Sequence, residues 1–318
     1  MNPIVVHLWG IDGAPSLVSP ESVAVYWLLN GYSGELFPKD AGELQIVFSN
    51  NVDVSPRHEL PVLVDKRCGE RVCGFVRIAQ YLSQGWGTKQ LLLDNALLEY
   101  TQDKLVALTE YQLFLEKTNY ENFTRKQYSK MLYWPMWNIV PLQERARVRA
   151  KCDKAIGYLP HSDDVDFLEY SGSIKKLEDE IAETAINMTQ SKTFKVTNQL
   201  KQRNKEELRA ANYSLQFKRK LEEFLKTWIQ LRERLNFKDV KIVDLLMWAN
   251  IYVQLNLPNG EAIKTHLANT ISKEFMESLS RHLDVCSKFE NEVSQRNAFF
   301  KEQGNPLNVM YSYARNYI

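Results

Sequence analysis

The sequence is poor in cysteine, and what it has is scattered. Its four cysteines, at positions 68, 73, 152 and 286, are too few for a disulfide framework, and none belongs to a Cys-x-x-Cys pair that would bind zinc. We therefore expect reduced structural thiols in a reducing compartment. A redox pair of Cys68 and Cys73, which are expected to lie near each other on a hairpin, remains the alternative.

Apolar runs of membrane-spanning length are also missing. The longest strongly apolar uncharged run, residues 245–257, is interrupted by three polar residues and ends at Pro258. A bilayer span needs roughly 20 apolar residues. The start of the chain lacks the features of a signal peptide and of a transit peptide. We expect no membrane-spanning segment.

The chain has almost no net charge, but its charges are segregated. The formal net charge of +1 gives no overall attraction to nucleic acid, and no nucleic-acid partner is expected. Residues 160–183 carry eight acidic and two basic residues, whereas residues 191–220 carry nine basic and two acidic residues. This pattern predicts either an insertion with mutually attracting solvated faces or a basic surface for an acidic partner. The candidate partner-binding residues are Lys192, Lys195, Lys201, Arg203, Lys205 and Arg209.

The N-terminal quarter predicts a βαβ unit followed by a hairpin and a helix. Residues 4–9 and 44–48 are short apolar runs typical of buried strands, and between them Ser19 precedes Pro20 as a helix N-cap. A right-handed crossover would make these two strands parallel. Runs at residues 60–64 and 72–73 flank a polar turn, and residues 75–82 have helical apolar spacing.

From Gln90 onward, glycine is scarce and the apolar spacing is helical, which predicts an all-helical region. At the end of the chain, Asn305 and Pro306 fit the N-cap and first position of a terminal helix. Its apolar face is interpreted as core packing; contact with a partner or a membrane surface is the alternative.

This order of elements, with Pro61 opening the third strand, resembles the thioredoxin-like half of glutathione transferases. The resemblance implies a glutathione-transferase-like fold, α/β plus all-α. It places a thioredoxin-like domain at residues 1–87 and an all-helical domain at residues 88–318, with the charge-segregated insertion around 160–210. It also implies a cis peptide bond between Leu60 and Pro61, which form the fold signature.

The transferase motif Glu/Asp-Ser-x-x-Ile-x-x-Tyr-Leu uses its acid and hydroxyl to hold the γ-glutamyl group of glutathione. This chain matches at Ile78, Tyr81 and Leu82, but Gly74 and Phe75 occupy the two ligand positions. We therefore expect no catalytic residue, no cofactor and no metal. Some transferases keep a catalytic residue near the first helix, but Ser16, beside Pro15, is interpreted here as a turn residue.

Longer stretches resemble one branch of this superfamily, the metaxins. In the first domain these are Leu8-Trp9-Gly10, Pro15-Ser16, Asn50-Asn51, Ser55-Pro56 and residues 60–63. Residues 111–115, 133–137, 191–195, 249–255 and 302–305 are similar to the fungal metaxin-like thirty-seven-kilodalton subunits of the mitochondrial sorting and assembly machinery, the SAM complex.

The metaxin resemblance implies a non-enzymatic subunit that is peripheral on the cytosolic face of the mitochondrial outer membrane. Its implied partners are a second metaxin-like SAM subunit, the barrel-forming SAM core and the central receptor of the outer-membrane translocase. Its implied role in protein import is to stabilise the β-barrel assembly complex, aid precursor release and link it to the translocase. A glutathione-dependent enzyme and an interaction module of a cytosolic complex are the alternatives.

Overall fold

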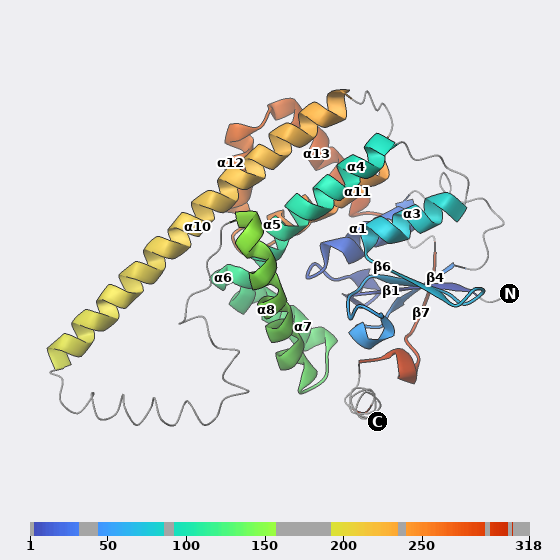
Figure 1. The fold of residues 1–318 in the computed structure, drawn as a ribbon, viewed down its shortest axis with the longest axis horizontal. Helices are drawn as coiled ribbons and strands as arrows, with labels where there is room; N and C mark the ends of the chain where they lie inside the picture. Colours follow the sequence, from blue (N-terminus) through green and yellow to red (C-terminus); the bar gives the residue numbers. More distant parts are fainter. Residues whose placement is uncertain are drawn as a thin grey trace.

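The computed structural model describes residues 3–31, 44–85, 92–156, 192–234, 240–289, 293–304 and 307. Within these residues, a sheet with helices α1 and α3 beside it lies next to a body of helices (Figure 1). This combination of a mixed α/β N-terminal part and a mostly helical C-terminal part is consistent with the expected glutathione-transferase-like layout.

The main sheet has five strands in the order β6-β5-β1-β4-β7. Strand β1 (Ile4–Leu8) pairs in parallel with β4 (Leu44–Phe48) and antiparallel with β5 (Val62–Asp65), which forms a hairpin with β6 (Glu70–Cys73). The predicted parallel pair and hairpin are thus confirmed. Because β1 is buried along its whole length, its side chains are nearly all apolar and do not alternate with polar ones.

Local signals in the sequence set the start of α1 (Pro20–Gly31) as predicted. The backbone N–H of Ser22 donates to the hydroxyl of Ser19 at 3.2 Å, so Ser19 is the N-cap and Pro20 the first helical residue. The expected helix after the hairpin is α3 (Phe75–Gly85), and the Leu60–Pro61 peptide bond is cis, as the resemblance implied.

The C-terminal region is not all helical, which corrects the expectation for residues 88–318. Strand β7 (Ser294–Arg296) returns to the N-terminal sheet and pairs in parallel with β4. Arg296 makes two short contacts with Glu302, at 2.6 and 2.8 Å, and reaches Gln45 of β4 at 3.1 Å. The sheet edge at β4 is therefore covered by a strand from the far end of the chain.

Several helices form the second part of the molecule. The segment α4 (Leu92–Thr101) continues through a π-helical stretch (Gln102–Val106) into α5 (Ala107–Glu110). A second π-helical stretch covers Tyr111–Leu115 and a third Tyr120–Thr124. The remaining helices are α6 (Lys117–Asn119), α7 (Arg125–Met131), α8 (Met136–Ile156), α10 (Lys192–Arg234), α11 (Ile242–Leu255), α12 (Gly260–Thr270) and α13 (Lys273–Cys286).

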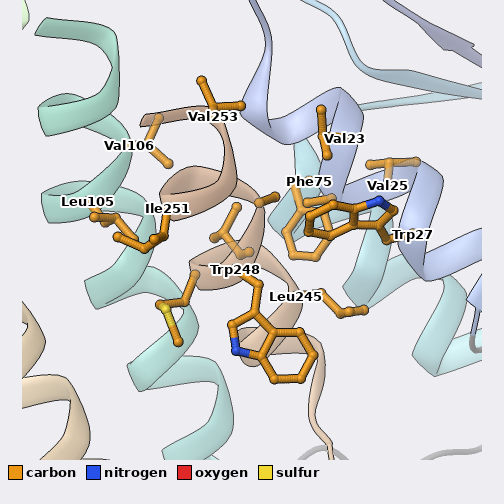
Figure 2. Packing of buried hydrophobic residues seen from close by; sticks show 14 of the residues in the cluster. Val23, Val25, Trp27, Phe75, Leu105, Val106, Leu245, Trp248, Ile251 and Val253 are labelled. Atoms are coloured by element: carbon orange, nitrogen blue, oxygen red, sulfur yellow. The ribbon is translucent and has the colours of Figure 1, made fainter. Parts of the chain in front are cut away.

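Helix α11 joins the two parts of the molecule. It packs against α1 on one side and against α4 on the other, and Figure 2 shows Trp27 and Phe75 of the sheet part close to Leu245 and Trp248 of α11. All four side chains are buried. One continuous core therefore runs from the sheet helices into the helical part.

Helix α10 is much longer than its neighbours. Its 43 residues correspond to about 65 Å at 1.5 Å per residue. In its C-terminal half, α10 buries the side chains of Phe217, Leu221, Phe224, Leu225 and Trp228. The N-terminal half extends past the other helices in Figure 1.

Two predictions fall partly or wholly outside the described residues. Residues 192–210 of the expected charge-segregated insertion form the start of α10, and the acidic residues 160–183 lie outside the described part. The predicted helix after Asn305 also lies outside it. Among the described helices, none combines the length and apolar character needed to cross a bilayer.

Candidate functional site

Gly74 and Phe75, which stand where transferases have the two glutathione-binding residues, lie at the N-terminus of α3. Gly74 has φ +81°, a backbone conformation that side chains with a Cβ rarely adopt, and its N–H donates to the carbonyl of Pro61 at 2.9 Å. The Phe75 side chain is fully buried in the core. Neither residue presents an acid or a hydroxyl to a ligand.

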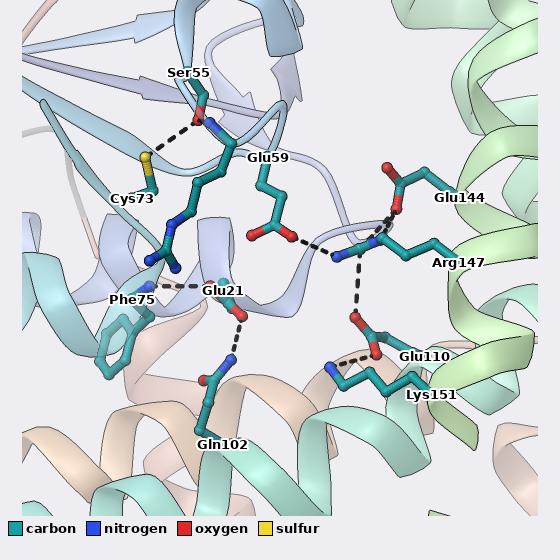
Figure 3. A network of polar contacts seen from close by, with 11 residues as sticks. Glu21, Ser55, Glu59, Cys73, Phe75, Gln102, Glu110, Glu144, Arg147 and Lys151 are labelled. Carbon is teal, nitrogen blue, oxygen red and sulfur yellow. Dashed lines mark hydrogen bonds and ion pairs between the residues drawn. The ribbon is translucent and has the colours of Figure 1, made fainter. Parts of the chain in front are cut away.

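A carboxylate from another helix fills this position instead. Oε2 of Glu21, in the first turn of α1, accepts a hydrogen bond from the backbone N–H of Phe75 at 3.0 Å, and Oε1 accepts from Gln102 at 2.6 Å (Figure 3). Helix α3 has no acidic residue in its own first turn. Glu21 therefore supplies a hydrogen-bond acceptor for an N–H group at the start of α3 that has no partner within the helix.

The environment of Glu21 has opposing effects on its ionisation. Burial raises the pKa of Glu21 above its ordinary value, against the opposing effect of the hydrogen bonds from Gln102 and Phe75. The carboxyl group is thus held by donors in a site with little solvent. An incoming carboxylate would have to displace it to reach the Phe75 N–H.

The residues that match the transferase motif have structural contacts. Ile78 and Leu82 are buried in the core, and the Tyr81 hydroxyl donates to Oδ2 of Asp65 at 2.8 Å. Arg67 contacts the same carboxylate at 2.6 Å. Hydrogen bonds from Arg67, and then from Tyr81, hold the pKa of Asp65 well below its usual range despite its burial. Tyr81 thereby fastens α3 to the hairpin turn.

Ser16 lies in a turn, as predicted from the sequence, and the cysteines are unpaired in the structure. Ser16 is buried, and its backbone N–H donates to the carbonyl of Trp9 at 2.9 Å, so it belongs to the turn before α1. All four cysteines are free thiols. Cys73 lies 3.2 Å from the hydroxyl of Ser55, and Cys68 is exposed in the hairpin turn.

Sequence reasoning missed a charged cluster between the sheet loops and the helices. Arg147 of α8 contacts Glu59 at 2.8 Å, Glu144 at 2.7 Å and Glu110 at 3.6 Å, and Lys151 contacts Glu110 at 2.7 Å (Figure 3). Glu59 belongs to the loop before β5, whereas the other four residues lie on helices. The cluster therefore ties the sheet part to α5 and α8.

The local sequence held only a weak signal of this cluster. Glu144 and Arg147 are three residues apart on a helix, which favours an ion pair, but Glu59 and Glu110 are distant in the sequence. Burial raises the pKa of Glu144, and the charge of Arg147 opposes that effect. We call this cluster a connector, because three carboxylates from the sheet loop and the helices meet one guanidinium.

A cavity of about 720 Å³ opens beside the cluster. Trp9, Val52, Leu132, Met136 and Ile139 supply apolar parts of its wall, and Glu59, Glu144 and Arg147 line one region of it. Across the described residues, no group of three histidine, cysteine or acidic side chains is arranged to hold a metal ion.

The six candidate partner-binding residues all lie on α10. Positions 201, 205 and 209 recur every four residues and so share one face of the helix, whereas positions 192, 195 and 203 fall outside that series. The structure thus places the residues on one continuous element.

The fold and the filled position at the start of α3 are consistent with a glutathione-transferase-like protein whose peptide site is closed. Two family models match the chain. The Tom37 model, described as an outer mitochondrial membrane transport complex protein, matches residues 22–145, and the Tom37 C-terminal domain model matches residues 173–317. The chain belongs to the Tom37 family, which confirms the metaxin-like resemblance. A comparison with curated proteins gave no match.

Proposed function

We propose that the chain is a non-catalytic subunit of the machinery that inserts β-barrel proteins into the mitochondrial outer membrane. In this role it stabilises the assembly complex, aids precursor release and links the complex to the outer-membrane translocase. The contact between Glu21 and the Phe75 amide carries the non-catalytic part of the proposal. The family description, a transport complex protein of the outer mitochondrial membrane, supports the location.

Closure of the α3 N-terminus argues against the glutathione-dependent alternative. In transferases the peptide's charged end needs an acid and a hydroxyl, and here it would meet Gly74 and Phe75. It would also meet the carboxyl group of Glu21, which already accepts from Phe75. Two carboxyl groups at one amide repel each other when both are charged.

Calorimetric titration of the full chain with glutathione tests this part directly. We expect no heat of binding at micromolar to millimolar glutathione and no conjugating activity. Micromolar binding together with conjugation of a standard electrophile would overturn the proposal of a non-catalytic subunit.

The role in assembly has its own test. Depletion of the protein from mitochondria should lower the amount of assembled porin-type barrels more than the import of matrix proteins, because open barrel strands need shielding until the barrel closes. Re-expression of the chain should restore assembly. Normal barrel assembly without the protein would rule this role out.

We further propose attachment at the cytosolic face through protein contacts with a second metaxin-like subunit and the barrel-forming core. Fractionation distinguishes this from an interaction module of a cytosolic complex. The chain should sediment with mitochondria, be released by alkaline carbonate and be degraded by protease added to intact mitochondria. Recovery only in the cytosol would favour the alternative, an interaction module of a cytosolic complex.

The basic stretch of α10 is proposed to contact the acidic cytosolic domain of the translocase receptor. Its extension past the other helices and its positive charge support this assignment. Reversal of Lys201, Arg203 and Lys205 to Glu should weaken receptor binding most at low salt, because screening shortens the range of charge attraction. Reversal of Lys218, Arg219 and Lys220 on the same helix is the control with the same charge change. Equal effects of the two triple variants would contradict the assignment.

The proposed domain division follows the sequence expectation. Helix α3 ends at Gly85 and α4 begins at Leu92, which supports a boundary near residues 87 and 88. Strand β7 crosses back over this boundary. We therefore propose that the first domain needs residues 294–296 to complete its sheet.

A further inference from the structure

Two adjacent aromatic side chains stand in solvent at the turn between α7 and α8. The exposed fraction is 61% for Tyr133 and 74% for Trp134. The other described tryptophans are buried or partly buried. Large exposed aromatic groups that lie together are unusual on a protein surface and mark interaction sites.

The backbone beneath this pair is firmly attached to the core. Leu132 is buried, and the buried Tyr128 packs edge-on against Trp9 with ring centroids 5.4 Å apart. The carbonyl of Tyr133 accepts a hydrogen bond from the N–H of Trp137 at 3.2 Å, at the start of α8. The aromatic pair is therefore presented by a fixed turn.

The sequence around the pair is positively charged. Residues 125–143 contain Arg125, Lys126 and Lys130 and no acidic residue. The two lysines lie one turn apart on α7 and are exposed. Neither forms an ion pair with a residue in the described part of the chain. Ile139 adds an apolar side chain with an exposed fraction of 38%.

Other exposed apolar side chains lack this combination. The ring of Phe299 lies 4.3 Å from the guanidinium of Arg296, which is itself paired with Glu302. Leu208 of α10 follows directly after two glutamates. Within the described residues, only the α7–α8 turn has an exposed tyrosine and an exposed tryptophan that follow exposed lysines in the sequence.

We propose that the α7–α8 turn rests on an anionic phospholipid surface. Tyr133 and Trp134 enter the headgroup layer, where amphipathic aromatic rings are favoured, and Lys126 and Lys130 face the lipid phosphates. The contact is peripheral and depends on both the rings and the charges. It requires no feature of the proposed assembly role beyond a location at a membrane.

Vesicle flotation of the full chain measures this contact. The protein should bind vesicles of phosphatidylcholine with about one fifth phosphatidylinositol and bind phosphatidylcholine alone much more weakly. The double variant Tyr133→Ala/Trp134→Ala should bind the anionic vesicles about ten-fold more weakly. The control Leu215→Ala, which removes another exposed apolar side chain (65% exposed), should bind like the wild type. Thermal unfolding checks that every variant is folded.

Charge substitutions test the contribution of the lysines to vesicle binding independently of the aromatic rings. Lys126→Gln and Lys130→Gln should each weaken binding to the anionic vesicles about five-fold. The control pair Lys104→Gln and Lys264→Gln makes the same change in net charge at other exposed positions. Equal losses for the two pairs would overturn the proposed orientation, as would unchanged binding of the aromatic double variant.

Tryptophan fluorescence gives an independent readout. Acyl-brominated lipids should quench part of the emission of the wild type and markedly less of Trp134→Phe. A photoreactive residue at position 134 should then crosslink to phospholipid in isolated mitochondria. Absence of bromolipid quenching, or crosslinks only to a protein subunit, would overturn the proposal.

Discussion

The carboxylate of Glu21 accepts a hydrogen bond from the backbone amide of Phe75 at 3.0 Å and so caps α3 from a neighbouring helix. Glu21→Ala should therefore destabilise the chain by about 1–2 kcal/mol, because the Phe75 amide and Gln102 lose their acceptor. Urea unfolding at neutral pH measures this. The control Glu274→Ala removes an exposed first-turn acid of α13 and should cost less than about 1 kcal/mol. Equal losses of unfolding free energy in the two variants would mean that Glu21 is an ordinary surface acid.

Replacing Glu21 with Gln tests its ionisation. The folded-state pKa of Glu21 is raised by burial, so the folded state binds its proton more tightly than the unfolded state does. The stabilisation from that proton is present at low pH and is lost as the pH rises through the folded pKa. The unfolding free energy of the wild type relative to Glu21→Gln should therefore fall as pH rises from the ordinary glutamate range. A constant difference would contradict the raised pKa.

Asp65 should show the opposite pH dependence. Its folded-state pKa is lowered, chiefly by the hydrogen bond from Arg67, so its contribution is present above the ordinary aspartate range and is lost as pH falls towards the folded value. Asp65→Asn should be less stable than the wild type at neutral pH, and the difference should shrink in acid. Tyr81→Phe, which removes one hydrogen bond to Asp65, should cost about 1 kcal/mol. Chemical denaturation at several pH values measures both.

Arg147 should contribute more to stability than an ordinary surface cation. Arg147→Met leaves Glu110, with 11% of its side chain exposed, and Glu144 without the guanidinium, and it should cost about 2 kcal/mol. The control Lys226→Met breaks an exposed pair with Glu222 and should cost less than about 1 kcal/mol. Glu59→Gln should also cost little, because 41% of its side chain is exposed. Similar losses for Arg147→Met and Lys226→Met in urea unfolding would contradict the connector role.

Strand β7 should protect the β4 edge of the sheet. Gln295→Pro removes a backbone donor and restricts the strand, so the amides of β4 should exchange hydrogen faster. Gln295→Ala is the matched control, because it removes the same side chain and keeps the backbone N–H. Mass spectrometry of peptides covering residues 44–48 measures the exchange. Equal exchange in the two variants would show that β7 is not needed to protect β4.

The sequence determined the elements whose signals are local. The apolar runs of β1 and β4, the Ser19-Pro20 start of α1 and the turn between β5 and β6 each depend on neighbouring residues, and each was predicted correctly. The loss of the transferase ligand residues at Gly74 and Phe75 was also readable, because it is a question of residue type at a known spacing.

Only the tertiary structure determined which group occupies the former ligand position at the start of α3 and which segment covers the edge of β4. Glu21 and Phe75 are 54 positions apart, and Arg147 and Glu59 are 88 apart, so no local periodicity links them. Residues 294–296 carry three polar side chains and join the sheet through backbone hydrogen bonds, which leave no apolar pattern in the sequence. Side-chain chemistry and spacing thus specified the local elements and the emptied ligand position. Only the packing of distant segments could bring a carboxylate to the free amide of α3 and a strand to the open edge of β4, because unpaired backbone groups accept any partner that the fold places within reach.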